Sequence, residues 1–227
     1  MKVKVGLTPG EQVAAPLGIV IDVLRATSTI CQALASGYER VVCVGEVEEA
    51  RRLAGPGVAL AGERHNVLIE GFDYGNSPRE LVAPPKAETL VLTTTNGTRA
   101  LLAAAELCET VLVASLLNLD AVIEEARGAD EVAILCAGVE GSFALDDAYV
   151  AGRIAAALEG DPDDAAIAAI RLAGAFDSAQ AGIGGGVSAA NIRRVGLDAD
   201  IAFCARESVL DRVPRVVERA ASSVVIA

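Results

Sequence analysis

The sequence has few of the residue types on which many metal sites and aromatic cores depend. It contains no Trp, one His and one Met, with four Phe and three Tyr. The core of this 227-residue chain must therefore consist mainly of aliphatic side chains and alanine, and the hydrophobic content of 52% allows a large one. A single His excludes a site with several histidine ligands. The five Cys are an odd number without close Cys-Cys spacing, so we expect buried, reduced thiols rather than disulfides or zinc ligands.

Long apolar runs and clusters of positive charge are also missing. The formal net charge is −12 and no run of Lys and Arg forms a basic stripe, which argues against nucleic acid or an anionic membrane as a partner. Charged residues interrupt the apolar runs well before the length of a membrane span, and the first residues show no signal-peptide pattern. We expect a soluble cytoplasmic protein. The high apolar content, with a mean hydropathy of +0.44, favours a homo-oligomer.

Short apolar runs rich in β-branched residues alternate with helical patterns along the chain. Several runs are apolar throughout, as expected of strands buried on both faces. This alternation predicts a single α/β domain over residues 1–227, a three-layer α/β/α sandwich with a mainly parallel (mixed) sheet. The expected strands are 3–7, 18–23, 40–44, 58–62, 89–93, 110–114, 131–137 and 200–205. The expected helices are 26–36, 46–54, 98–107, 117–127 and 144–158.

Two regions depart from this alternation. Residues 62–86 are rich in Gly, Pro, Asn and charge, and loops of this length are usually functional or disordered. Residues 159–188 contain an Ala-rich helical pattern followed by "GIGGGVS", which suggests a small helical subdomain or lid. The segment "GGGVSA" (184–189) fits a loose dinucleotide-binding pattern, but no clear strand precedes it, so we do not expect a dinucleotide site.

Two predicted strand-to-helix junctions carry residues suited to binding anions, because ligands of α/β sheets collect at the carboxyl ends of strands. In "VIDVLRATST", Asp22 ends a strand, while Arg25 and the hydroxyls of residues 27–29 open a helix whose free N–H groups attract negative charge. Simple helix capping would need only one such residue. In "TTTNGTRALL", we expect Asn96 to cap a helix, Gly97 to leave room for an anion, and Arg99 to contact that anion. A solvent-facing Arg99 is an equally good interpretation of this second segment alone.

Two further segments carry acids. The loop 62–86 places Glu63 and Asp73 near amides and arginines, a mixture that suits both a hard cation and an anionic substrate, although loops are polar for solvation as well. In "CAGVEGSFALDDAYVAG", Asp146 and Asp147 lie in the first turn of a helix. Adjacent acids at this position also stabilise a helix dipole without any metal.

The ordered blocks "VIDVLRATSTI", "GERHNVLIEGFDYGNSP", "TTTNGTRAL", "CAGVEGSFALDDAYVAG" and "LDADIAFCAR…VP" together resemble the 2-phosphosulfolactate phosphatase family. The similarity extends from about residue 18 to residue 214, and the ordered set is far more specific than any one block. The resemblance implies an α/β enzyme that uses Mg²⁺ to convert 2-phosphosulfolactate to sulfolactate and phosphate, on a route to coenzyme M.

We therefore hypothesise a Mg²⁺-dependent phosphatase that acts on a small phosphorylated sulfonate or carboxylate. An isomerase or lyase for a phosphorylated three-carbon acid, or a non-enzymatic binding protein for small anionic metabolites, would use the same anion-binding junctions. The expected catalytic residues are Asp22, Arg25, Glu63 and Arg99, with Glu63 or an aspartate as general acid or base. The expected substrate-binding residues are Thr27, Ser28, Arg64, Asn76, Asn96, Gly97 and Thr98. The expected metal ligands are some of Asp22, Asp73, Asp146 and Asp147.

Overall fold

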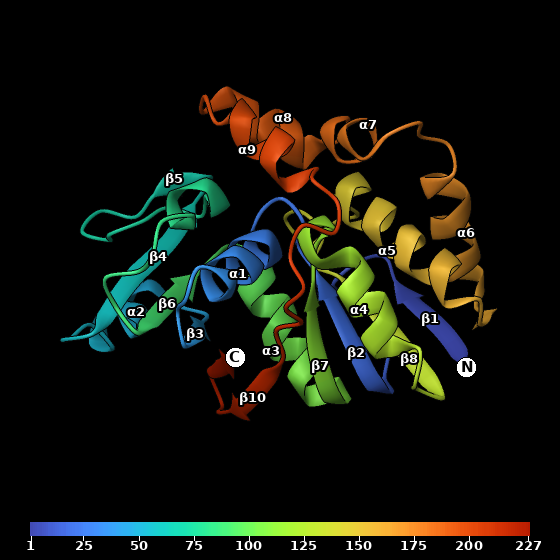
Figure 1. Ribbon diagram of the computed structural model, residues 1–227, viewed down its shortest axis with the longest axis horizontal. Coiled ribbons are helices and arrows are strands. Elements are labelled where there is room, and N and C mark those ends of the chain that lie inside the picture. The colour runs from blue at the N-terminus through green and yellow to red at the C-terminus, as the bar shows by residue number, and fades with distance from the viewer.

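The structure, a computed structural model, describes residues 1–227 and contains two sheets (Figure 1). The first sheet has five strands, all parallel, in the spatial order β7-β2-β8-β1-β9. Its central strands are buried on both faces, which explains why their sequences are apolar throughout. The strands are β1 (Lys2–Gly6), β2 (Ala15–Ile21), β7 (Cys108–Ala114), β8 (Glu131–Cys136) and β9 (Asp161–Pro162).

The second sheet is mixed and has the order β10-β11-β3-β6-β4-β5. Its three central strands β3, β6 and β4 are parallel, whereas β11 and β10 at one edge and β5 at the other add antiparallel pairs. The strands are β3 (Arg40–Val44), β4 (Val58–Arg64), β5 (Val67–Leu68), β6 (Thr89–Thr93), β10 (Val216–Arg219) and β11 (Ser223–Ile226).

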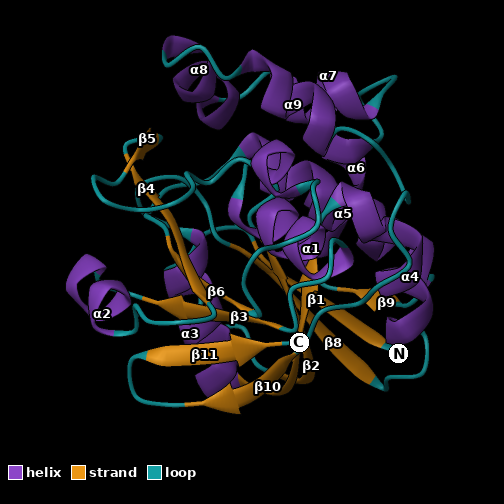
Figure 2. Cartoon of the chain, turned by 60° about the vertical axis from the view of Figure 1, so that its left-hand side comes forward, coloured by secondary structure: helices purple, strands orange, loops and turns teal.

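Helices fill the space between and around the sheets (Figure 2). Helices α1 and α3 form a shared layer, since their buried side chains pack with one face of each sheet in a single core. On the far face of the first sheet lie α4, α5 and α6, and α2 covers the outer face of the second. These helices are α1 (Ala26–Ala35), α2 (Val47–Arg52), α3 (Gly97–Leu107), α4 (Leu119–Ala126), α5 (Leu145–Leu158) and α6 (Asp164–Ala173), with short 3₁₀ helices at Pro78–Leu81 and Leu116–Asn118.

Three short helices, α7 (Ala179–Gly184), α8 (Val187–Arg194) and α9 (Asp198–Cys204), lie together at one end of the molecule, at the top of Figures 1 and 2. The segment 200–205, predicted as a strand, is helical, and that prediction is wrong. Its buried residues Asp200, Ile201 and Cys204 share one helical face, and acids occupy the first turn, where they stabilise the N-terminal end of the helix.

The predicted α/β sandwich with mainly parallel strands is confirmed, with two sheets sharing one helical layer. All five cysteines are free and buried, as expected. None of the helices is both long and apolar enough to cross a membrane.

Candidate active site

Asp22 lies at the first junction, between β2 and α1, and its carboxylate is fixed by the helix that follows. Its Oδ1 accepts a hydrogen bond from Ala26 N at 3.2 Å. The Thr27 hydroxyl donates to Asp22 O at 2.8 Å and accepts from Asp22 N at 3.1 Å, and the Ser28 hydroxyl donates to Val23 O. Thr27 and Ser28, predicted to bind substrate, are fully buried and hold the turn together.

The second junction, between β6 and α3, brings Gly97 against the first. A Cβ built on Gly97 would lie 2.4 Å from Ala26 Cβ and 2.6 Å from Asp22 Oδ2. The missing side chain therefore makes room for Asp22, and not for a free anion as predicted. Asn96 does not cap α3 with its side chain, contrary to the prediction, because Thr94 does so: Thr98 N donates to Thr94 Oγ1 at 3.2 Å. This bond also occupies the Thr98 amide.

Asp146 and Asp147 bring the start of α5 to the same place. Asp147 accepts two backbone hydrogen bonds, from Val23 N at 3.0 Å and Gly138 N at 2.9 Å, and so ties α5 to the ends of β2 and β8. Asp146 is 2% exposed, and its Oδ1 has no hydrogen-bond partner. Asp147 is therefore held on both oxygens, whereas Asp146 keeps an oxygen available for a ligand.

All three aspartates have a raised pKa, mainly because they are buried. Burial and, to a smaller extent, the charges of Asp146 and Glu63 raise the pKa of Asp22 to about 7, against the lowering effects of the Ala26 N–H group and the charge of Arg25. Burial raises the pKa of Asp146 to about 6. Burial, and then the two other aspartates, raise the pKa of Asp147 well above its ordinary value. Such a cluster favours the uptake of protons or of a cation.

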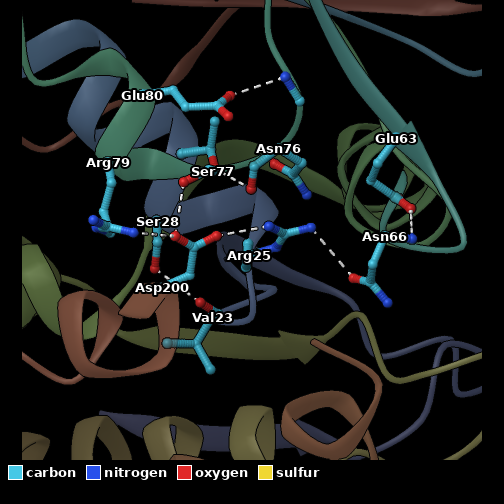
Figure 3. Close-up of polar contacts among 12 residues, drawn as sticks. Val23, Arg25, Ser28, Glu63, Asn66, Asn76, Ser77, Arg79, Glu80 and Asp200 are labelled. Carbon is cyan, nitrogen blue, oxygen red and sulfur yellow. Dashed lines mark hydrogen bonds and ion pairs between the residues drawn. The ribbon is translucent and has the colours of Figure 1, made fainter. Parts of the chain in front are cut away.

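Arg25 supplies a buried positive charge that acts on Asp22. Figure 3 shows its guanidinium between Asp200 and Asn66. The guanidinium is 2% exposed and donates to Asp200 Oδ2 at 2.7 Å and to Asn66 Oδ1 at 3.3 Å, while its Nε has no partner. Ser77 donates to Asp200 Oδ1 at 2.8 Å, and Arg79 lies 3.7 Å from the same oxygen. The sequence analysis missed Asp200. In the sequence, Asp200 is recognisable only as an acid beside an apolar segment. Because that segment was predicted to be a strand, the acid was not considered a site residue.

Glu63 and Arg64 are both tied to the surrounding backbone. The Glu63 carboxylate accepts from Thr95 N at 2.9 Å and Asn66 N at 2.8 Å, and so joins the end of β4 to the second junction. Arg64 donates to the carbonyls of Glu63 and Gly45 and to the Thr93 hydroxyl. Arg64, predicted to bind substrate, therefore uses its guanidinium to hold β4 against β6.

Arg99 is exposed on the first turn of α3 and lines a cavity of about 620 Å³ together with Asn96. Asn96 Oδ1 accepts from Glu140 N at 3.2 Å, which connects this cavity to the loop before α5. Arg99 forms no ion pair in the structure, so its guanidinium is available to an anion entering the cavity.

Two predicted residues lie in different surroundings. Asp73 Oδ2 accepts from Leu60 N at 2.8 Å, and Asp73 lines a separate cavity with Tyr38 and Tyr74. The structure does not bring Asp73 together with the other predicted metal ligands. Asn76 is buried and accepts from the Thr29 hydroxyl through its main-chain carbonyl, while its side-chain Oδ1 lacks a partner.

The donor set fits a Mg²⁺ ion that shares its ligands with a substrate. Nowhere do three His, Cys, Asp or Glu side chains form a cluster able to hold a metal ion by themselves. However, Mg²⁺ is commonly held by one or two carboxylates together with substrate phosphates. The Asp22 carboxylate accepts a hydrogen bond only through Oδ1, and Asp146 Oδ1 is buried without a partner. The carboxylates of Asp22 and Asp146 therefore suit such an ion.

Comparison with known proteins identifies this chain as a phosphoric monoester hydrolase. A family model described as 2-phosphosulpholactate phosphatase matches residues 4–219. A "Probable 2-phosphosulfolactate phosphatase" of Thermus thermophilus is 40% identical over 222 residues, covering 94% of each chain. The "2-phosphosulfolactate phosphatase" of Methanothermobacter thermautotrophicus is 36% identical over 215 residues, covering 94% of this chain and 92% of the relative. The chain belongs to the 2-phosphosulpholactate phosphatase family.

Proposed function

We propose that this protein is a Mg²⁺-dependent phosphatase that hydrolyses 2-phosphosulfolactate to sulfolactate and phosphate, a reaction of the coenzyme M biosynthesis type. One observation carries the proposal: Asp22, Asp146 and Arg25 are buried together where the carboxyl ends of two parallel strands meet two helix N-termini. Opposite charges in a buried cluster suit a phosphate ester, whose oxygens need positive charge and whose attacking water needs a proton acceptor.

Asp22 and Asp146 would hold the Mg²⁺ ion, which when bound supplies positive charge to the phosphate oxygens. Arg25 places a guanidinium beside Asp22, with its Nε free to donate to a phosphate oxygen. Asp200 keeps this guanidinium in place, and Asp147 keeps α5 against the two strands.

The available positive charge at Arg99 supports a substrate with a second anionic group. Arg99 lines the cavity of about 620 Å³ next to the second junction, where a sulfonate or carboxylate would find a planar cationic partner. A phosphate ester without a second anionic group would leave this guanidinium unused.

Phosphate release measured with malachite green over a panel of small phosphate esters, with and without EDTA, tests the proposal. We expect release from 2-phosphosulfolactate that EDTA abolishes and added Mg²⁺ restores. An isomerase or lyase would consume a phosphorylated three-carbon acid without releasing phosphate, and a binding protein would consume nothing. Either result would refute the proposed function.

We further propose that the protein forms a homo-oligomer in the cytoplasm. The composition supports this, because 52% of the residues are hydrophobic and several large apolar side chains, such as Leu68 and Phe143, are exposed. Analytical ultracentrifugation that detects only monomer would contradict the proposal.

A further inference from the structure

The turn of the β4–β5 hairpin contains two residues in the left-handed backbone conformation. The antiparallel pairing of β4 with β5 leaves only His65 and Asn66 for this turn. Both have positive φ angles, 54° for His65 and 63° for Asn66, as a common type of two-residue turn requires. Glycine adopts such angles without strain, so the turn by itself does not explain why position 66 carries a side-chain amide.

The side chain of Asn66 turns inward to Arg25, whereas the neighbouring His65 is exposed (Figure 3). Asn66 Oδ1 accepts a hydrogen bond from Arg25 Nη2 at 3.3 Å. The backbone of Asn66 is held as well, because its N–H group donates to the Glu63 carboxylate at 2.8 Å. The same carboxylate accepts from Thr95 N at 2.9 Å and ties the turn to the second junction. Position 66 is therefore fixed where its amide oxygen reaches a buried guanidinium.

The three nitrogens of the Arg25 guanidinium have three different surroundings. Nη1 donates to Asp200 Oδ2 at 2.7 Å, Nη2 donates to Asn66, and the buried Nε has no partner. A guanidinium is planar and its donors have a fixed geometry, so hydrogen bonds from both terminal nitrogens set the direction of the Nε–H group. The bond to Asp200 alone would let the group swing about that contact. Asp200 and Asn66 together therefore determine where Nε points.

The amide of Asn66 also differs from Asp200 in carrying no charge. Asp200 is fully buried and already gives Arg25 one carboxylate partner. A second carboxylate at position 66 would offset the attraction of Arg25 for a phosphate, whereas an amide oxygen accepts without a formal charge. Arg25 also lies near enough to Asp22 for its charge to oppose the rise in the pKa of that carboxyl. Released from Asn66, the guanidinium would have Asp22 as an alternative partner.

We propose that Asn66 is a positioning residue of the phosphate site, which holds the Arg25 guanidinium away from Asp22 and keeps its Nε directed at the phosphate. The proposal rests on the proposed function, in which Arg25 binds a phosphate oxygen. Asn66 acts through Arg25 and does not contact the substrate. The second sheet thereby takes part in the reaction, since β4 and β5 belong to it, whereas Arg25 follows β2 of the first sheet.

A pair of glycine substitutions separates the amide of Asn66 from the backbone of the turn. Asn66→Gly removes the side chain and keeps a residue that adopts a positive φ readily. His65→Gly makes the same change at the neighbouring position, where the side chain is exposed, and is the matched control. Both variants loosen the turn to a similar extent, so a difference between them reports on the contact with Arg25.

Isothermal titration with inorganic phosphate in the presence of Mg²⁺ provides a readout without turnover. We expect Asn66→Gly to weaken phosphate binding about tenfold, the effect of misdirecting one charge-assisted hydrogen bond, while His65→Gly binds phosphate like the wild type. The kcat/KM of Asn66→Gly for 2-phosphosulfolactate should fall at least as much. An Asn66→Gly variant with wild-type phosphate affinity, or an equal loss in His65→Gly, would overturn the proposal.

A double-mutant cycle tests whether Asn66 acts through the guanidinium. Arg25→Lys keeps a positive charge beside Asp200 but lacks the planar group and its Nε. In this background Asn66→Gly should leave phosphate affinity unchanged, because the group that Asn66 positions is gone. A direct contact between Asn66 and phosphate would give the same loss in both backgrounds, and that result would overturn the proposal.

A spectroscopic measurement covers the case in which Arg25→Lys does not fold. In ¹H–¹⁵N spectra recorded without phosphate, the Arg25 Nε–H signal should move in Asn66→Gly and stay in place in His65→Gly. An unchanged signal in Asn66→Gly would overturn the proposal. Failure of the proposed function has a different signature, since wild-type protein would then release no phosphate from 2-phosphosulfolactate, whatever the signal of Arg25 does in the variants.

Discussion

Replacing Asp22 with asparagine should stabilise the metal-free protein while abolishing its activity. Asparagine has nearly the same shape, and its side-chain oxygen can still accept from Ala26 N as Asp22 Oδ1 does. The substitution removes a negative charge that is buried near Asp146 and Glu63, both of which disfavour its ionisation. Asp22 would then be required for turnover and would also lower the stability of the folded protein. Such a trade-off between activity and stability is common at functional sites.

The size and pH range of this effect follow from the pKa of Asp22, raised from 3.8 to about 7. Because the folded-state pKa lies above that of the unfolded chain, the stability that the carboxyl provides is fully present below pH 3.8 and is lost as pH rises to about 7. The loss amounts to about 4 kcal/mol at most, shared with the neighbouring acids. For a chain of this length it corresponds to a Tm difference of up to roughly 10 °C.

Thermal unfolding of both proteins in EDTA, between pH 4 and pH 8, measures this difference. The Tm of Asp22→Asn should match that of the wild type near pH 4 and exceed it increasingly up to pH 7. Added Mg²⁺ should raise the Tm of the wild type more than that of the variant. Asp177→Asn, at an exposed position, is the control and should leave the pH profile unchanged. An Asp22→Asn variant that is less stable than the wild type at pH 8 would refute the reasoning.

Three further substitutions test how the site is held. Asp200→Asn leaves a buried guanidinium without its ion-pair partner and should cost about 3–5 kcal/mol in urea unfolding, whereas Arg79→Ala, at the exposed partner, should cost less than about 1 kcal/mol. Gly97→Ala should displace the carboxylate that lies 2.6 Å from the added Cβ and lower kcat roughly a hundredfold, while Gly45→Ala, whose nearest neighbour is 3.9 Å away, should not. Arg99→Ala should lower kcat/KM for 2-phosphosulfolactate by roughly a hundredfold or more, and near-normal kinetics would remove this arginine from the site.

The sequence predicts most of the strands and helices because their signals are local. The runs at 40–44 and 89–93 are strands with those bounds, since apolar β-branched segments are bordered by turn residues. The prediction of a strand at 200–205 was wrong because its apolar residues fit either period, and in the structure its buried residues share one helical face. A run of six residues rarely distinguishes the two alternatives.

The positions of the site residues were less predictable than their identities. Asp22 and Asp146 stand out at strand-to-helix junctions, but nothing local indicates that Asp200, 175 residues beyond Arg25, is its ion-pair partner. Likewise, a threonine that opens a helix looks the same in sequence whether it binds a ligand or, like Thr27, closes the turn on itself. Long-range pairing of polar side chains depends on tertiary packing, which sequence periodicity does not describe.

The hydrogen bonds of the three aspartates distinguish their roles. Asp147 accepts two backbone N–H groups, Asp22 accepts one, and Asp146 Oδ1 accepts none. A buried carboxylate with two such donors is already oriented and partly compensated, so Asp147 needs no ligand to hold its place. An uncompensated carboxylate oxygen costs free energy until a proton or a cation reaches it. The need for a ligand is therefore greatest at Asp146, which makes it the carboxylate best suited to hold the proposed cation.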